Sequence, residues 1–512
     1  MAADLELPSY LLLLLVLAIS LLWFKCKRSA GTRQLHLPPA PWALPVIGHL
    51  HHLAGALPHH ALRGLARRHG PLMLLRLGEL EVLVASSPAA AREIMKTQDA
   101  TFASRTVTSM LQLAYRGAEG VVFAPYGDGW RQLRKICTQE LLSAGRVQSF
   151  RAVREEELGG LLRAVADAAS SCSPVNLDER LSAYVAESTV RAIIGSQFRQ
   201  RETYHQMLQD SLKIVPGMTL PDLFPSSRLV LLLSSVPGRM EYNRQRMNCL
   251  MDTIIQEHQE AGRKDKDKDL LDVLLRLQKE AAGSSQSPLI TENINIVLMD
   301  LFGAGSETSA TVLQWAMAEL MRNPRVMRKV QDEVRRALAG HDKVTEATLP
   351  GLHYMRLVIK ETLRLHPPSP LLLPRRCGAT RTQVLGFDVP EGAMVIVNAW
   401  MIGRDPAYWD DPDEFSPERF EQNGRDFKGV DFEFIPFGAG RRICPGMAFG
   451  LAHIHLALAA MVYHFDWKMP DGMEPKDLDM TESFGITTQR KSKLVLVPVP
   501  RVPVLASAMN IC

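Results

Sequence analysis

The stretch from Phe437 to Gly446 constrains the fold of this chain most, because it places one cysteine in a turn rich in glycine. Arg442 lies two positions before Cys444, and an apolar helical run, Met447 to Tyr463, follows at once. Glycines in such a turn let the backbone approach a large flat group closely. The N–H groups of the turn, the positive end of the following helix and Arg442 all favour a thiolate over a thiol. The sequence therefore predicts that Cys444 is a metal ligand or a nucleophile.

Composition narrows the class of protein. With 46% hydrophobic and 22% charged residues, a chain of 512 residues has ample material for a large globular core. The net charge of +4 is spread thinly and gives no indication of nucleic-acid binding. The 7 cysteines are scattered and form no CxxC pair, which argues against a disulfide framework and a structural zinc site and favours a reducing compartment.

The N-terminal run from Leu7 to Phe24 is almost purely aliphatic and approaches the ~20 residues that a membrane-spanning helix needs. A cleaved secretory signal is the alternative, but no small-residue cleavage site separates this run from Lys25, Lys27 and Arg28. The positive-inside rule then places the remainder of the chain in the cytosol. We expect a membrane anchor over residues 1–28 and a stiff proline-rich hinge over residues 29–50.

The longest predicted helix begins at Thr291 and runs to about Arg322. Its middle, residues 303–309, reads GAGSETS, and each glycine inside a helix costs roughly 1 kcal/mol against alanine. Close packing against another helix explains the glycines but not the acid, Glu307, beside them. Small residues next to the Glu307 carboxylate and the Thr308 hydroxyl also suit a site where a bulky partner approaches and a proton is passed on. We favour this second interpretation.

Other patterns indicate the remaining elements. Strands are expected at Leu72–Leu77 paired with Glu81–Ala85, at Leu371–Arg375, at Val384–Val389 paired with Ala393–Val397, and at Leu494–Val497. Further helices are expected at Pro88–Lys96, through most of Val147–Lys279, and at Tyr354–Leu365. Two residue pairs share a helix face, Trp130 with Arg134 and Glu361 with Arg364. Taken alone, each pair is more commonly an ordinary surface contact, although Trp130 with Arg134 could also bind a buried anion.

In this order along the chain, the motifs resemble one family closely. It is the cytochrome P450 haem-thiolate monooxygenases, and within it the plant group anchored in the endoplasmic reticulum. Phe437–Gly446 matches the family pattern F-x-x-G-x-R-x-C-x-G at every fixed position. Residues 304–309 resemble the oxygen-activation motif, with Glu307 where the family more often has aspartate. The resemblance covers the whole chain, from the anchor to the last strand.

Two motifs of the resemblance concern haem binding. Trp130-x-x-x-Arg134 is similar to the helix that binds one haem propionate, and Pro374-Arg375 is similar to the strand that reaches the other. Haem b (iron protoporphyrin IX) is the implied cofactor, with Cys444 as the iron ligand whose thiolate favours O–O bond cleavage. The residues implied to bind the haem are Trp130, Arg134, Ala304, Arg375, Phe437, Arg442 and Gly446.

A structural triad and a catalytic pair complete the resemblance. Glu361-x-x-Arg364, with Arg419 further along the chain, is similar to the family's buried Glu-Arg-Arg triad. The resemblance implies that this triad holds the cysteine turn in place and that it is structural. Glu307 and Thr308 are implied to be the catalytic pair that delivers protons to dioxygen.

The resemblance also implies a fold, a partner and a location. The fold is mainly α with small β-sheets, and residues 51–505 form the catalytic domain. The sequence has no Rossmann fingerprint or flavin segment, so the implied electron donor is a membrane-bound NADPH–cytochrome P450 reductase. Arg131, Lys135 and Arg441 are candidate reductase contacts. The implied location is the endoplasmic reticulum membrane, with a single span and a cytosolic catalytic domain.

The expected substrate is small and apolar. The stretches that line the pocket in this family are here mostly aliphatic, sulfur-containing or hydroxylic, which suits a bulky apolar ligand. We expect NADPH- and O2-dependent hydroxylation of a di- or sesquiterpenoid plant metabolite. A phenolic, flavonoid or indolic substrate is the alternative. Remoter alternatives are a same-fold isomerase or dehydratase acting without reductase, and a non-catalytic haem carrier. The intact Glu307–Thr308 pair argues against both.

Overall fold

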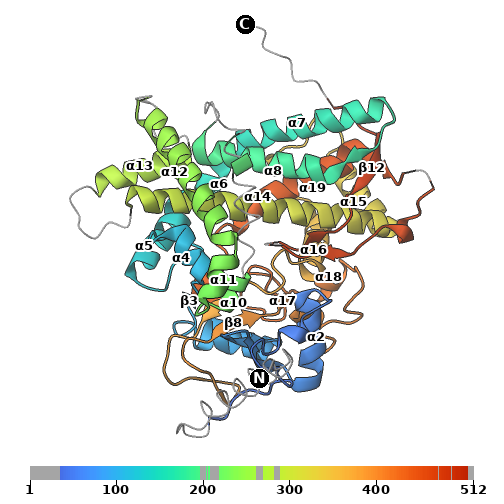
Figure 1. Ribbon diagram of the computed structural model, residues 1–512. Helices are drawn as coiled ribbons and strands as arrows, with labels where there is room; N and C mark the ends of the chain where they lie inside the picture. The colour runs from blue at the N-terminus through green and yellow to red at the C-terminus, as the bar shows by residue number, and fades with distance from the viewer. Residues whose placement is uncertain are drawn as a thin grey trace, which may run out of the picture.

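The computed structural model describes residues 35–195, 203, 206–207, 218–260, 269–281, 289–470, 472–485 and 487–504. The predicted anchor over residues 1–28 lies outside the described residues, as does the first part of the hinge. Figure 1 shows a helical part around α14 and, below it, a smaller part that contains the main sheet. The expectation of a mainly α fold with small β-sheets is confirmed.

The axis of the helical part is α14, Thr291–Arg322, which begins and ends where the sequence predicts. Two helices pack along it, α8 (Leu177–Ile194) and α19 (Met447–His464). A Cβ added at Gly305 would lie 3.4 Å from Thr189 Cγ2 of α8 and 3.5 Å from Phe449 Cε1 of α19. Gly305 therefore serves helix packing, which corrects the expectation that both glycines of the motif open space for a ligand.

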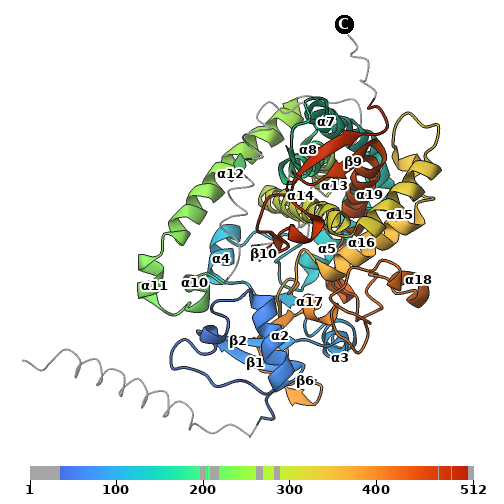
Figure 2. The ribbon, with the colours of Figure 1, turned by 90° about the vertical axis from the view of Figure 1, so that its right-hand side faces the viewer.

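Both α14 and α19 are long and apolar enough to cross a membrane, but most of each apolar stretch is buried inside the protein. They are core helices by this criterion. The other helices of the described chain are α2 Pro58–His69, α3 Pro88–Arg92, α4 Ser109–Tyr115, α5 Asp128–Ile136, α6 Ala144–Ser149, α7 Arg151–Ser170, α10 Leu220–Leu223, α11 Arg228–Leu233, α12 Val236–Glu260, α13 Leu270–Glu280, α15 Pro324–Ala337, α16 His353–Leu365, α17 Ala399–Ile402 and α18 Arg419–Asn423. Figure 2 shows α12 leading along one side of the molecule to α11 and α10.

The main sheet has five strands in the order β1-β2-β8-β5-β3. The predicted pair β1 (Leu72–Leu77) and β2 (Leu80–Ala85) is confirmed and is antiparallel. The predicted pairing of Val384–Val389 with Ala393–Val397 is wrong, because β8, Met394–Val397, pairs parallel with β2 and antiparallel with β5. The remaining strands are β3 Ser104–Arg105, β4 Val175–Asn176, β5 Arg375–Arg376, β6 Gln383–Val384, β7 Phe387–Asp388, β9 Phe465–Lys468, β10 Glu482–Ser483, β11 Gln489–Arg490 and β12 Val495–Pro500.

Left-handed backbone conformations explain both errors in the predicted strands. Leu385 and Gly386 adopt φ of 50° and 79°, which makes a two-residue turn and pairs β6 with β7 instead. The predicted strand Leu371–Arg375 is extended regularly only from Arg375. Leu372 has φ of 51°, a conformation that a strand cannot contain. Neither turn was visible in the pattern of apolar residues.

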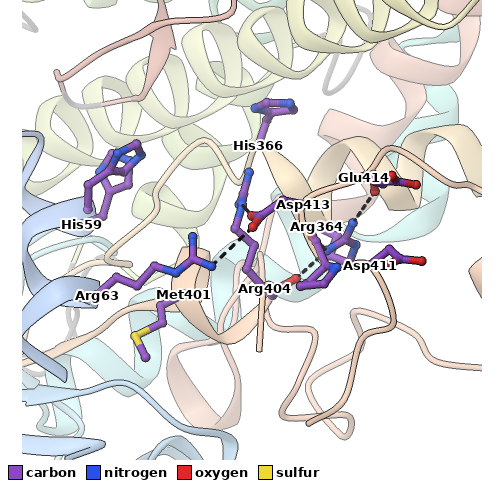
Figure 3. A network of polar contacts seen from close by, with 12 residues as sticks. His59, Arg63, Arg364, His366, Met401, Arg404, Asp411, Asp413 and Glu414 are labelled. Carbon is purple, nitrogen blue, oxygen red and sulfur yellow. Dashed lines mark hydrogen bonds and ion pairs between the residues drawn. The ribbon is translucent and has the colours of Figure 1, made fainter. Parts of the chain in front are cut away.

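A buried ion-pair network joins α16 to the loops that precede the cysteine turn. Arg364 donates to Glu361 from Nε at 2.7 Å and from Nη2 at 2.8 Å, and both side chains are fully buried. Arg419 Nε donates to the same carboxylate at 2.9 Å. Arg364 also donates to the carbonyls of Gly403 and Glu414, at 2.7 and 3.0 Å. Figure 3 shows Arg364 pointing into this loop, toward Glu414.

A second group of contacts, which we call the Asp300 clasp, fixes the loop after α4 against the central helix α14. The Asp300 carboxylate of α14 accepts hydrogen bonds from Val121 N at 2.8 Å, Val122 N at 2.9 Å and Tyr115 Oη at 3.1 Å. A Cβ at Gly120 would lie 2.4 Å from Asp300 Oδ2, so the close approach of the loop requires glycine there. Burial raises the pKa of Asp300 to about 6, against the lowering effect of these hydrogen bonds.

Arg364→Ala leaves the Glu361 carboxylate buried with fewer partners, so we expect a loss of about 3–5 kcal/mol in the free energy of unfolding. Urea unfolding followed by circular dichroism measures this loss. The control is Arg325→Ala, which removes a pair between Glu418 and a side chain that is 63% exposed. That change costs at most about 1 kcal/mol. Equal losses in the two variants would contradict the structural role of the network.

Asp300→Asn tests the Asp300 clasp through pH. A carboxyl whose pKa is raised in the folded state contributes stability below its ordinary pKa, and this contribution is lost as the pH rises toward about 6. We therefore expect the variant to gain about 2 kcal/mol relative to the wild type between pH 4.5 and 7.5, measured by urea unfolding. The control is Asp252→Asn on the exposed side of α12. A pH-independent difference would show that Asp300 has no raised pKa.

Candidate functional site

Four arginines from distant parts of the chain converge in the interior. They are Arg105 of β3, Arg134 of α5, Arg375 of β5 and Arg442 of the turn before Cys444. Arg105, Arg375 and Arg442 are 7%, 3% and 7% exposed. Burial, followed by repulsion from the other three, lowers the pKa of Arg105 well below its ordinary value. The pKa of Arg442 falls to about 9 through burial and repulsion from Arg375 and Arg134. We call these four residues the arginine cage.

Backbone carbonyls hold most of the guanidinium groups of the arginine cage. Arg442 donates to Ala103 O at 2.7 Å and to Ala124 O at 2.6 Å. Its guanidinium lies 3.9 Å from the ring centre of Trp130. Trp130 Nε1 in turn donates to Val121 O at 3.0 Å, beside the Asp300 clasp. The clasp and the arginine cage therefore share one loop.

The arginine cage carries more charge than the protein neutralises. Among the described residues, Asp99 is the carboxylate that pairs with it, 3.1 Å from Arg375 Nη1. Buried charges are costly unless they are paired, and neutral carbonyls do not remove the net charge. Planar guanidinium groups suit carboxylates, which they bind with two parallel hydrogen bonds. The arginine cage therefore fits a ligand that brings more than one carboxylate into the interior, as the two propionates of haem do.

The turn around Cys444 has little freedom. Cys444 N donates to Phe437 O at 3.0 Å, which closes the loop. Gly440 has φ of 70°, and a Cβ there would lie 2.0 Å from Met95 O, so no other residue fits. Arg134 Nη2 donates to Ile443 O at 2.5 Å, next to the cysteine. These contacts tie the turn to the arginine cage.

The Cys444 thiol lies in an environment that opposes its ionisation in the absence of a metal. Burial raises its pKa, and the smaller opposite effects of Gly446 N–H and Arg134 do not reverse this. The expectation that the surroundings of Cys444 favour the thiolate is therefore wrong for the protein alone. A thiol with a raised pKa is a poor nucleophile, whereas a bound metal ion deprotonates the thiol that ligates it. Of the two predicted roles, the metal ligand fits better.

Space remains beside the cysteine and on the facing helix. A Cβ at Gly446 would meet no atom within 4 Å, and one at Gly438 would meet only Leu372 Cδ1, at 4.0 Å. Ala304 is exposed although it lies at the middle of α14, whose neighbouring turns include buried residues. Small residues thus leave room on both sides, as a flat cofactor requires. Phe437 is partly buried and its ring contacts Phe427, with centres 5.2 Å apart.

The predicted catalytic pair lies on α14 near Ala304. Thr308 Oγ1 donates to Ala304 O at 2.5 Å, one turn earlier. Glu307 Oε1 accepts hydrogen bonds from Thr487 Oγ1 and Gln489 Nε2, both at 2.9 Å. Burial raises the pKa of Glu307, which the two hydrogen bonds oppose. A carboxyl with a raised pKa is closer to releasing and taking up protons at neutral pH than an exposed one.

Several residues of the site were missed from the sequence. Arg105 completes the arginine cage, and its signal was its position as the sole cation between Gln98 and Tyr115. Asp99 and Asp300 carried no signal, because single acids in apolar surroundings are common and their partners lie far along the chain. The contacts of Glu307 with Thr487 and Gln489 likewise depend on a segment that lies 180 and 182 residues further along the chain.

Comparisons with known proteins agree on the family. The family model for cytochrome P450 matches residues 38–497. The chain is 48% identical to ent-cassadiene hydroxylase of Oryza sativa subsp. japonica, over 96% of this chain and 97% of the relative. It is 45% identical to desmethyl-deoxy-podophyllotoxin synthase of Sinopodophyllum hexandrum, over 94% of this chain and 95% of the relative. A solved structure of a zebra fish cytochrome P450 with progesterone shares the fold, with a TM-score of 0.76 over 87% of this chain and 100% of that chain at 24% identity.

The family explains why the arginine cage, the cysteine turn and the small-residue stretch of α14 lie together. Its members bind haem and generally use O2 and a redox partner. The two plant relatives, from Oryza sativa and Sinopodophyllum hexandrum, are cytochromes P450 that act on specialised metabolites. The chain belongs to the cytochrome P450 family and is a haem-thiolate monooxygenase.

Proposed function

We propose that this enzyme hydroxylates a di- or sesquiterpenoid plant metabolite with O2 and with electrons from NADPH. The observation that carries the reaction type is the arginine cage, whose Arg134 donates to the carbonyl of Ile443 next to Cys444. Support for the substrate class comes from relatives that include diterpenoid and terpenoid oxygenases, among them ent-cassadiene hydroxylase. Support also comes from Met110 and Leu111 of α4 and Phe302 of α14, which are apolar, buried and belong to stretches that line the pocket in this family.

The proposal assigns the residues of the site as follows. Cys444 holds the haem iron, and Trp130 with the arginine cage binds the propionates, while Ala304, Phe437 and Gly446 leave room for the ring. Bound haem supplies oxygen activation and hydrogen abstraction from the substrate. The arginines, clasped by backbone carbonyls, orient the cofactor and exclude water around its carboxylates.

In this proposal Glu307 and Thr308 transfer protons to the site of oxygen activation. Thr308 Oγ1 turns from Ala304 O toward the substrate side and donates its hydrogen bond there. Glu307 holds a proton more readily than an exposed acid, because burial raises its pKa. Thr487 and Gln489 fix its carboxyl by hydrogen bonds to Oε1, so that the second oxygen stays available for proton exchange.

An NADPH–cytochrome P450 reductase is the proposed electron donor. It would dock on the side of the cysteine turn, where Arg131, Lys135 and Arg441 are exposed cations. Arg441 also donates to Tyr126 Oη at 3.1 Å, which holds its guanidinium at the surface. Such a cluster attracts an acidic partner and raises its association rate at low salt.

The proposed location is the endoplasmic reticulum membrane, with a single span over residues 1–28 and the catalytic domain in the cytosol. Exposed apolar residues support contact with a membrane. On α11, Leu229, Leu232 and Leu233 are 65%, 83% and 77% exposed, and Trp42 of the hinge is 65% exposed. The turn between β1 and β2 contacts both α10, which precedes α11, and the hinge, since Glu79 N donates to Leu223 O and Gly78 N donates to Ile47 O. Large exposed leucines are costly in water and favourable in a lipid interface.

A phenolic, flavonoid or indolic substrate is the second candidate, because one relative is named for desmethyl-deoxy-podophyllotoxin and not for a terpene hydrocarbon. Co-expression with a reductase and a panel of di- and sesquiterpene synthases, followed by mass spectrometry, separates the candidates. We expect one terpene to gain 16 mass units only when the enzyme, the reductase and oxygen are all present. Turnover of phenolic or indolic feeds, with none of the terpenes, would refute the substrate proposal.

Thr308→Ala tests proton delivery. We expect the variant to bind haem and consume NADPH in microsomes with reductase, but to convert a 10²–10⁴-fold smaller share into hydroxylated product. The matched control is Ser309→Ala, since Ser309 is buried against Gly450 of α19. Full coupling of NADPH use to product in the Thr308 variant would remove Thr308 from the proposed mechanism.

A further inference from the structure

Two histidines at the start of α2 converge on one glutamate of β10. Glu482 Oε2 lies 2.7 Å from His59 Nε2 and 2.9 Å from His60 Nε2. The three ligand atoms lie within 4.8 Å of one another. The His59 and Glu482 side chains are 0% and 8% exposed, whereas the His60 side chain is 45% exposed. The cluster is therefore built into the protein on one side and open to solvent on the other.

Ordinary side-chain packing explains the burial of His59 but not the convergence of two imidazoles on one carboxylate oxygen. One imidazole is enough to give a buried glutamate oxygen a hydrogen-bond donor, yet here two imidazoles contact the same carboxylate oxygen. His59 Nδ1 is buried and has no hydrogen-bond partner among the described residues. His60 is held against Trp400 by ring stacking, with centres 4.3 Å apart and planes at 28°. Trp400 thus fixes the orientation of the exposed imidazole as well as that of the buried one.

The donor set suits a divalent transition metal. Two imidazoles and one carboxylate are a common ligand set of Zn²⁺, which bonds each at about 2.0–2.2 Å. Tetrahedral geometry at those lengths separates two ligand atoms by about 3.3 Å. The present contacts of 2.7 and 2.9 Å need only small side-chain rotations to reach that separation. The fourth position would face solvent on the His60 side.

Neighbouring cations do not block this site. Arg404 lies over the Trp400 ring at 4.2 Å and forms an ion pair with Asp413 at 3.1 Å. Arg63 also reaches Asp413, at 3.4 Å. Figure 3 shows both arginines directed at Asp413, with His59 set apart from them. Asp413 therefore neutralises part of the positive charge of Arg404 and Arg63.

We propose that His59, His60 and Glu482 form a Zn²⁺ site that fastens α2 to the β10–β11 hairpin. Glu482 lies opposite Arg490 in this hairpin, and the neighbouring residue Gln489 donates to Glu307 of α14. The metal therefore fixes the hairpin whose other strand positions the carboxyl of Glu307. Binding at Nε2 leaves the proton of each neutral imidazole on Nδ1, and no redox change takes place.

The test uses the haem-loaded full-length enzyme in detergent, without an affinity tag, after treatment with a chelator. Zinc chloride is titrated against a fluorescent zinc indicator. His60→Ala removes one ligand at an exposed position, and His60→Arg keeps a hydrogen-bond donor toward Glu482 but cannot ligate. His69→Ala, near the end of the same helix, is the matched control. The chain has 15 histidines, so the difference between variants isolates this site from others.

We expect the wild type and His69→Ala to share one zinc equivalent that binds at least 10-fold more tightly than any in His60→Ala or His60→Arg. Zinc should also slow hydrogen exchange of residues 482–490 in the wild type and leave it unchanged in both His60 variants. Equal zinc affinity in all four proteins, or no tight zinc equivalent in the wild type, would overturn the proposal. Slowed exchange in the His60 variants would place the zinc elsewhere.

Discussion

The excess of buried positive charge in the arginine cage is the constraint on which the rest of the structure depends. Arg105, Arg375 and Arg442 are almost fully buried, Arg134 lies beside them, and Asp99 supplies the paired carboxylate. Such a cluster repels itself, and both burial and repulsion lower the pKa of Arg442. A haem group resolves this conflict, because its propionates bring the missing negative charge. Binding of the two propionates therefore stabilises this arrangement of arginines.

The surrounding helices and loops hold the arginine cage and the cysteine turn in place. The ion-pair network of Glu361, Arg364 and Arg419 fixes the loops that lead to the cysteine turn. The Asp300 clasp fixes the loop that carries the carbonyls of Val121 and Val122, which accept from Trp130 and from Arg105. Cys444 and the propionate partners are therefore set by loops that α14 and α16 anchor.

Sequence reasoning recovered the parts of the site that local patterns encode. The cysteine turn, the bounds of α14 and the pair on α5 each depend on residues close together in the chain. Arg105 was missed because its partners come from other segments of the chain. The pairing of β8 was missed because the left-handed turn at Leu385 and Gly386 breaks the expected hairpin. Gly305 was misread because its partner, Phe449, lies on another helix.

The structure is specific about the cofactor but not about the substrate. The arginine cage and the cysteine turn account for haem chemistry, whereas the apolar residues of the expected pocket fit many ligands.

The central claim is that Cys444 is the iron ligand. The carbon monoxide difference spectrum of the reduced enzyme tests it most directly, with the exposed Cys172 as control. We predict the haem-thiolate band in the wild type and in Cys172→Ala, and its loss in a folded Cys444→Ala protein. A Cys444→Ala protein that keeps this band would contradict the account.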